Sequence, residues 1–190
     1  MPRAYEFLAD GFEVTEAMVP VDILHRGNVE VKLISVNGSD WVASNDGIAI
    51  RCDMRIEDVT DWDDVDLLMI PGGLPGATNL NTHQGVREAF VRQAAKGKRV
   101  AAICAAPMVL GSTGLLKGRR ATCFPGFEEF LTGATLTHEP VTVDGNITTA
   151  EGPGAASKYG FCLLEQLTSE QVADDWKETM RFKHVYGKDY

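Results

Sequence analysis

The sequence predicts a single α/β domain in which helices cover both faces of a mainly parallel, doubly wound β-sheet. Short apolar runs typical of strands alternate with helical stretches along the chain. Several of these runs are bounded by Gly and Pro and are apolar throughout, as strands buried on both faces are. The 190 residues show no internal repeat and no linker, so one domain is expected over residues 1–190.

The chain begins with a strand, a helix and a second strand. The first strand is expected at Tyr5–Leu8, followed by the turn-forming residues Ala9–Gly11. The segment Thr15–Arg26 has apolar residues on a helical face, and Gly27 ends it. Glu30–Val36 is expected to form the second strand.

A β-excursion and a buried strand follow. The segments Val42–Ile50 and Arg51–Asp53 are strand-like, and Asp46-Gly47 interrupts them as a turn. Val65–Ile70 ends in Pro71-Gly72-Gly73 and is the clearest case of a strand buried on both faces.

The second half of the chain continues the alternation. The expected helices are Gly85–Ala95, Met108–Leu116, Gly154–Leu167 and Glu170–Phe182. The expected strands are Arg99–Ile103, Arg120–Cys123, and the hairpin of Thr142–Val143 with Ile147–Thr149 around Asp144-Gly145-Asn146.

Charge and hydropathy exclude several classes of function. The formal net charge is −9, and Arg119–Arg120 is too short a basic cluster to hold nucleic acid or an anionic membrane. Apolar runs such as Leu67–Ile70 are far shorter than the ~20 residues that a membrane span needs. The N-terminus has acidic residues where a signal peptide is apolar, so a cytoplasmic protein is expected.

The four cysteines are Cys52, Cys104, Cys123 and Cys162. They form no CxxC pair, so neither a zinc site of the usual spacing nor a disulfide framework is expected. Three of them are expected to be buried apolar residues, whereas Cys104 follows a predicted strand directly.

Three predicted turns lie just after strands, at Ala9–Glu16, Pro71–Ala77 and Cys104–Pro107. The carboxyl ends of parallel strands meet at one edge of a sheet, where ligands of open α/β sheets bind. This placement brings together the candidate site residues Glu16, Gly72, Gly73 and Cys104.

Cys104 is the candidate nucleophile. A sharp strand-to-helix turn would expose its thiol, and the following helix N-terminus would lower the thiol pKa. The backbone N–H groups of Gly72, Gly73 and Ala105 could form an oxyanion hole. The alternative for Cys104 is a structural core cysteine, and the alternative for Gly72-Gly73 is a simple turn.

Glu16 is the candidate proton carrier. In a partly buried cleft its pKa would rise, and the protonated carboxyl could donate a hydrogen bond to a thiolate. The alternative is a solvated carboxylate at a helix start, where Glu13 is the nearer capping residue. No histidine follows Cys104 directly, and none of the four suggests a Cys–His pair.

The segments GFEVTEAMVPVDIL, LLMIPGGLPGATNL, RVAAICAAPMVL and TTAEGPG occur in this order. Together they resemble the ThiJ/PfpI superfamily, in the branch of the parkinsonism-associated deglycase and its bacterial relatives, from about Ala4 to about Lys183. The resemblance implies a flavodoxin-like three-layer sandwich and a homodimer. It carries the family's oxidation-prone nucleophile onto Cys104, its protonated glutamate onto Glu16, and its oxyanion hole onto Gly72, Gly73 and the amide of Ala105; Gly152–Gly154 would border the site.

Three departures from the family pattern bear on function. Ala105 stands where the protease-type members have histidine, which argues against a peptidase. Phe124 precedes Pro125 where human-type members have histidine, as in some bacterial relatives. An arginine near the cysteine in some members corresponds to Asp46, which would make the pocket less favourable for anions.

The leading hypothesis is therefore a Cys104-dependent enzyme acting on small reactive carbonyls, of the glyoxalase or deglycase type, with no metal or organic cofactor. One alternative is a redox-sensing or holdase homodimer in which Cys104 is oxidised. Another is a dimeric interaction protein with an unused cleft.

Overall fold

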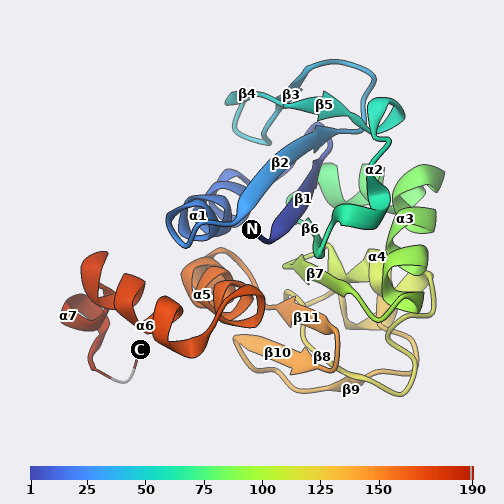
Figure 1. Cartoon of the computed structure of the whole chain (residues 1–190). Helices are drawn as coiled ribbons and strands as arrows, with labels where there is room; N and C mark the ends of the chain where they lie inside the picture. Colours follow the sequence, from blue (N-terminus) through green and yellow to red (C-terminus); the bar gives the residue numbers. More distant parts are fainter. Residues whose placement is uncertain (189) are drawn as a thin grey trace.

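A seven-stranded sheet of order β10-β11-β7-β6-β1-β2-β5 forms the centre of the molecule (Figure 1). The computed structural model describes residues 1–188 and Tyr190. The strands of this sheet are β1 (Arg3–Leu8), β2 (Glu30–Ser35), β5 (Met54–Arg55), β6 (Leu67–Ile70), β7 (Arg99–Ile103), β10 (Val141–Asp144) and β11 (Ile147–Ala150). Within this sheet the β10–β11 hairpin is antiparallel, and the neighbouring pairs β11–β7, β7–β6, β6–β1, β1–β2 and β2–β5 are parallel. The prediction of a mainly parallel α/β sheet is confirmed.

Helices cover the sheet on both sides (Figure 1). One layer contains α1 (Val14–Arg26) and α5 (Ala156–Leu167), extended by α6 (Glu170–Thr179) and α7 (Phe182–Tyr186). The other contains α2 (Gly76–Thr82), α3 (Gln84–Ala95) and α4 (Pro107–Ser112). Two small sheets lie outside the main one and consist of β3 (Trp41–Ala43) with β4 (Ala49–Arg51), and β8 (Arg120–Ala121) with β9 (Thr135–Leu136). None of the helices within residues 1–188 and 190 is long and apolar enough to cross a membrane.

The buried central strands hold the layers together. All four residues of β6 are buried, and because side chains alternate along a strand, Leu68 and Ile70 pack in one core while Leu67 and Met69 pack in the other. Each such side chain stabilises the fold by about 1.5–3 kcal/mol. Both helix layers therefore pack against apolar side chains of β6.

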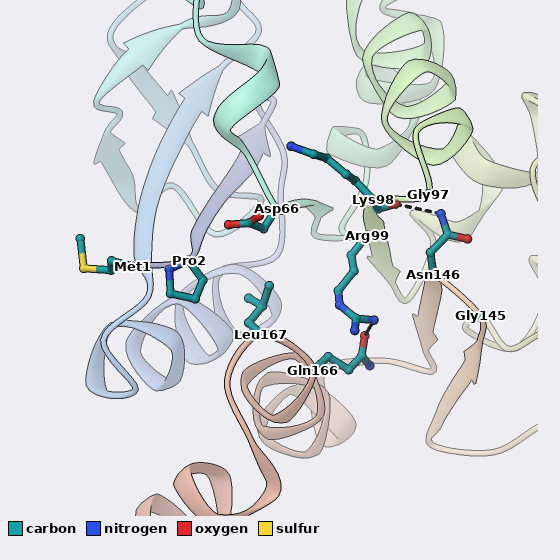
Figure 2. Close-up of a pocket in the computed structure, with 10 residues that line it drawn as sticks. All are labelled: Met1, Pro2, Asp66, Gly97, Lys98, Arg99, Gly145, Asn146, Gln166 and Leu167. Carbon is teal, nitrogen blue, oxygen red and sulfur yellow. Dashed lines mark hydrogen bonds between the residues drawn. The ribbon is translucent and has the colours of Figure 1, made fainter.

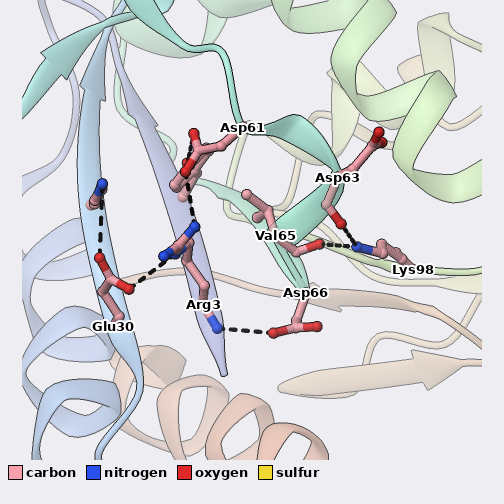
Figure 3. Close-up of polar contacts among 9 residues, drawn as sticks. Arg3, Glu30, Asp61, Asp63, Val65, Asp66 and Lys98 are labelled. Atoms are coloured by element: carbon pink, nitrogen blue, oxygen red, sulfur yellow. Dashed lines mark hydrogen bonds and ion pairs between the residues drawn. The ribbon is translucent and has the colours of Figure 1, made fainter. Parts of the chain in front are cut away.

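Ionic contacts join the amino ends of these strands (Figure 3). The Arg3 guanidinium pairs with Glu30 of β2 at 2.9 Å and with Asp61 at 2.8 Å, and the Arg3 backbone N–H donates to Asp66 at 2.9 Å. Lys98 donates to the carbonyl of Val65 at 2.8 Å. These contacts fix the edge of the sheet opposite to the strand ends that carry Cys104.

Four expectations about elements are wrong in detail. The segment Gly76–Thr82, given no secondary structure from the sequence, is the helix α2. The helix expected at Met108–Leu116 already ends at Ser112. The strand expected at Arg120–Cys123 is only two residues long and pairs with β9 outside the main sheet. The helix expected at Glu170–Phe182 divides at Arg181, whose backbone is left-handed with φ of 68°.

A carboxyl group lies inside the α1/α5 layer without a hydrogen-bond partner. Glu6 of β1 is 2 % exposed, and its Oε2 has no partner among the described residues. Burial, and then the Glu16 carboxylate, raises the pKa of Glu6 well above its ordinary value. Burial therefore favours the neutral form of Glu6, because ionising it in this layer would be costly.

This burial predicts a stability that depends on pH. The folded state binds the Glu6 proton more tightly than the unfolded chain does. The free energy of unfolding should therefore fall as pH rises above the ordinary carboxyl pKa of 4.5, by at most about 1.4 kcal/mol per pH unit. Glu6→Gln keeps the shape and cannot ionise, so it should remove this part of the fall. Urea unfolding of both proteins between about pH 5 and 8 measures the difference; equal slopes would contradict the prediction.

Candidate active site

The carboxyl ends of the adjacent strands β1, β6 and β7 meet at one edge of the sheet. The loop after β1 leads into α1 and carries Glu16 to this edge. The loop after β6 contributes Gly72 and Gly73, and β7 runs into Cys104. The structure thus brings together the four residues that the sequence placed at this edge.

Cys104 lies on a strained strand-to-helix elbow. Its backbone is left-handed, with φ of 65°, which costs a non-glycine residue about 1–3 kcal/mol. Two hydrogen bonds hold it there: its N–H donates to the carbonyl of Ala150 at 2.9 Å, and its carbonyl accepts from Phe124 N–H at 2.8 Å. The elbow leaves the thiol half-buried, whereas Cys52 and Cys123 are buried as expected. The expectation that Cys162 is buried is wrong, because it is also only partly buried.

Glu16 is fully buried in the first turns of α1. Its Oε2 accepts from the Gly72 N–H at 2.9 Å, while Oε1 has no geometric hydrogen-bond partner among the described residues. Glu13 is the N-cap of the helix, and its carboxylate accepts from the Glu16 N–H at 2.7 Å. Glu16 is therefore not the solvated carboxylate that the sequence left open as an alternative.

Gly72 is the point at which these groups touch. A Cβ built on Gly72 would lie 2.7 Å from the Cys104 Cβ and 2.7 Å from the Glu16 Oε2. Gly73 has φ of 84°, and a Cβ on it would lie 2.4 Å from the Glu13 backbone nitrogen. A larger residue at Gly72 would push the thiol and the carboxyl apart, and one at Gly73 would press on the backbone of residues 11–13.

The glycine N–H groups have different roles in this arrangement. The Gly72 N–H is already hydrogen-bonded to Glu16, so it positions the carboxyl. The N–H groups of Gly73 and Ala105 lie beside the Cys104 sulfur and favour its anion. An oxyanion next to Cys104 would find its donors in Gly73 and Ala105 rather than in Gly72.

Burial governs the protonation of the pair. It raises the pKa of Glu16 to about 7, against the opposing effects of the Cys104 thiol and the Gly72 N–H. Burial, followed by the Glu16 carboxylate, raises the pKa of the Cys104 thiol to about 12. The expectation of a lowered thiol pKa is therefore wrong while Glu16 is ionised. The helix after the elbow has only six residues and starts at Pro107, and its N-terminus does not offset the burial.

Two groups coupled in this way titrate as a pair. The pair releases its first proton at about pH 7 and its second at about pH 12. Between these values it carries one negative charge and one proton, and that proton can reside on the carboxyl or on the sulfur. A thiolate next to a neutral Glu16 is one of the two forms.

A cavity of about 340 Å³ opens onto the Cys104 thiol. Its lining comes from six parts of the chain: Glu13, Glu16, Asn45, Gly73, Leu74, Cys104, Ala105, Phe124, Phe127 and Pro153. Pro153 confirms in part the expectation that residues 152–154 border the site. None of the four histidines lines the cavity.

The sequence did not single out Asn45, Leu74 and Phe127. Because Leu74 directly follows Gly73, its position next to a predicted site residue could have identified it as part of the cavity lining. Asn45 reaches the site because its N–H donates to the carbonyl of Phe12 at 2.9 Å, a contact between distant segments. Asp46, expected at the place of the family's arginine, does not line the cavity; its neighbour Asn45 does.

A larger cavity, about 770 Å³, lies at the opposite edge of the sheet (Figure 2). Polar side chains on its wall already contact other protein groups: Arg99 donates to Gln166 at 2.9 Å, and Asn146 donates to the carbonyl of Lys98 at 2.8 Å. We assign the chemistry to the smaller cavity because it holds the strained cysteine and the buried carboxyl. Within residues 1–188 and 190, the His, Cys, Asp and Glu side chains form no group of three that could hold a metal ion.

The fold and the site define an α/β protein with a cysteine elbow beside a buried glutamate. The chain belongs to the DJ-1/PfpI family, whose family model matches residues 2–166. It is 31 % identical over 184 residues to the Parkinson disease protein 7 homolog of Danio rerio, covering 95 % of this chain and 97 % of that protein. It is 33 % identical over 149 residues to a deglycase of Pyrococcus abyssi, covering 77 % of this chain and 87 % of that protein.

Solved structures agree with the fold. A mutant of a DJ-1 superfamily protein from Salmonella typhimurium superposes with a TM-score of 0.89 at 30 % identity, covering 98 % of both chains. Oxidized DJ-1 of Toxoplasma gondii gives a TM-score of 0.89 at 29 % identity, covering 95 % of this chain and 98 % of that one.

Gly72→Ala tests the packing of the site. The added methyl would press on Cys104 and Glu16, so we expect the alkylation rate of Cys104 to fall, by up to about 10²-fold for a displacement near 1 Å. The measurement is iodoacetamide labelling followed by peptide mass spectrometry.

Gly85→Ala is the matched control for Gly72→Ala. Gly85 lies in the first turn of α3, where the nearest atoms to an added Cβ belong to the His83 side chain at 3.2 Å. It should leave Cys104 labelling unchanged. Equal rates in wild type and Gly72→Ala would show that the site tolerates the methyl group.

Proposed function

We propose that this protein is a Cys104-dependent enzyme that converts small reactive carbonyl compounds by glyoxalase- or deglycase-type chemistry, with a role in carbonyl or oxidative stress. One observation carries the proposal: the Cys104 thiol, a carboxyl with a pKa of about 7, and the N–H groups of Gly73 and Ala105 face one small cavity. The name of the Pyrococcus abyssi relative supports the same type of activity.

The first step uses the form of the pair in which Cys104 is a thiolate and Glu16 is neutral. The thiolate adds to the aldehyde carbon of an α-oxoaldehyde and a C–S bond forms. The π electron pair moves to the carbonyl oxygen, which Gly73 and Ala105 stabilise and which takes the Glu16 proton. The product is a hemithioacetal, and Glu16 is left as a carboxylate.

The Glu16 carboxylate then acts as a base. It removes the proton from the former aldehyde carbon and returns a proton to the neighbouring carbon. The hydroxyl proton of the hemithioacetal passes to the oxygen of that neighbouring carbon, which gives a 2-hydroxyacyl thioester. Water adds to the thioester, the C–S bond breaks, and the 2-hydroxy acid leaves with the thiol restored. One carbon is oxidised as its neighbour is reduced, so the reaction needs no redox cofactor.

The same residues disfavour a peptidase. Ala105 follows Cys104, and no histidine lines the cavity, so no imidazole is placed to protonate the amine that amide cleavage releases. Transfer of protons in this site depends on Glu16.

We also propose a homodimer. Met18 and Val19 of α1 and Leu33 of β2 are only partly buried apolar residues at the edge of the α1/α5 core, and a second copy would cover such a surface. Light scattering at micromolar concentration should give twice the mass of one chain. A monomer mass would refute the proposal.

Turnover of methylglyoxal by the wild type and by Cys104→Ser tests the function, with free thiols and contaminating enzymes excluded. We expect turnover to disappear in Cys104→Ser. If both proteins are inactive while peroxide converts Cys104 to the sulfinate before the other cysteines, the redox-sensing alternative is favoured.

The pH dependence of Cys104 alkylation tests the role of Glu16. In the wild type we expect labelling to rise with a midpoint of about pH 7, the first step of the pair. Glu16→Gln keeps a hydrogen-bond donor but has no transferable proton, and Glu16→Leu has neither. The midpoint of labelling should therefore rise in Glu16→Gln and rise further in Glu16→Leu. Carbonyl turnover should fall in both by about 10²-fold or more. Unchanged midpoints would exclude Glu16 as the proton carrier.

A further inference from the structure

An apolar groove continues the Cys104 cavity. This second cavity has a volume of about 470 Å³, and its wall includes three prolines, Pro125, Pro140 and Pro153. Phe124 and Pro153 line both cavities, so the two spaces share one wall. We refer to the second cavity as the proline groove.

Backbone contacts fix the shared wall relative to the thiol. The Phe124 N–H donates to the Cys104 carbonyl at 2.8 Å, which places this residue directly beside the elbow. A Cβ built on Gly152 would lie 3.0 Å from the Phe124 ring, so the ring packs closely against this glycine. The prolines have a fixed φ, which adds rigidity to the groove.

Phe124 presents apolar surface to any ligand of Cys104. It is 43 % exposed, a high value for a phenylalanine at the mouth of a cavity that contains a candidate nucleophile. Concave sites for small molecules are mostly apolar with a few polar groups, and Phe124 supplies the apolar part next to the polar thiol and carboxyl.

The charges around both cavities have one sign. The lining of the Cys104 cavity contains the carboxyls Glu13 and Glu16, and the proline groove contains Glu151. Neither lining contains a lysine, arginine or histidine. Such a site disfavours an anionic substrate such as a 2-oxo acid.

We propose, on the basis of the proposed function, that the substrates are neutral α-oxoaldehydes with an aryl or branched alkyl substituent. The aldehyde carbon reaches Cys104, and the substituent lies against Phe124 and extends into the proline groove. The 2-hydroxy acid product ionises at neutral pH, so the surrounding carboxylates favour its release.

The first arm of the test does not depend on turnover. Alkylation rates of Cys104 are measured with iodoacetamide and with N-benzyliodoacetamide, each divided by the rate for glutathione. We expect the benzyl reagent to be favoured by about 10-fold in the wild type, since burial of an aromatic ring is worth at least this factor. Phe124→Ala should abolish the preference, and Phe124→Leu should retain part of it, which guards against a loss of folding.

Two further variants sharpen the comparison. Gly154 lines the proline groove, and a Cβ on it meets nothing within 4 Å, so Gly154→Leu should fill the groove and reduce the benzyl preference. Tyr186→Ala removes an exposed aromatic residue that lines neither cavity, and the preference should stay at the wild-type value.

The second arm compares kcat/KM for phenylglyoxal, methylglyoxal and 4-carboxyphenylglyoxal, an anionic α-oxoaldehyde. We expect phenylglyoxal to exceed methylglyoxal by about 10-fold and the anionic 4-carboxyphenylglyoxal to be poorer than phenylglyoxal. Turnover of methylglyoxal as fast as phenylglyoxal, with a benzyl preference that Phe124→Ala leaves unchanged, would overturn the inference and leave the proposed function standing. A benzyl preference that depends on Phe124, without turnover of any aldehyde, would support the groove as a binding site and refute the proposed function.

Discussion

The loop after β1 and the loop after β6 lie backbone against backbone, and the site depends on this contact. Glu13 N–H donates to the carbonyl of Gly72 at 3.0 Å, and Gly76 N–H donates to the carbonyl of Gly11 at 3.2 Å. Glycines make the approach possible, since a Cβ on Gly11 or Gly76 would lie within 2.6 Å of an atom of the facing loop. This contact brings the start of α1, and with it Glu16, against the turn that touches Cys104. The three strand ends are neighbours because of the sheet topology, but the thiol and the carboxyl meet because glycines let the two loops approach each other closely.

Two carboxyls in the α1/α5 layer show how similar burial can have different consequences. Glu16 is held by the Gly72 N–H and lies at the cavity, so its pKa of about 7 allows it to give and take a proton near neutrality. Glu6 has neither a partner for Oε2 nor a place in the cavity lining, and its pKa is raised well above the ordinary value. Burial is the largest cause of both shifts, and the backbone donor together with access to the cavity distinguishes a usable acid from an inert one. The stability cost of Glu16 at high pH follows from the same shift that makes it suited to proton transfer.

The sequence predicted the features that depend on local pattern. The all-apolar β6, the strand that leads into Cys104, and the Glu13 cap of α1 follow from periodicity and capping rules, and the structure has them. Features that depend on distant contacts were not predictable in this way. Asn45 reaches the cavity through Phe12, and two residues of β8 pair with β9 rather than with the main sheet. The sequence predicts a lowered pKa for the Cys104 thiol, and this is wrong for the same reason. The helix N-terminus can be recognised in the sequence, whereas the burial of Cys104 and the ionisation of Glu16 are properties of the fold.

The division between inner and outer parts of the site has a consequence for function. The inner part, next to the thiol, consists of backbone groups and of the side chains of Cys104 and Glu16. It is fixed by the strained backbone of the elbow and by glycine contacts that admit no larger residue. The outer wall consists of side chains such as Asn45, Leu74 and Phe124, which project from loops and can be exchanged without disturbing the elbow. The position of the thiol is therefore a property of the fold, whereas the cavity wall is a property of this chain. Relatives at about 30 % identity share the fold, and their names describe their own activity; the cavity wall of this chain carries carboxylates and a half-exposed phenylalanine and no lysine, arginine or histidine.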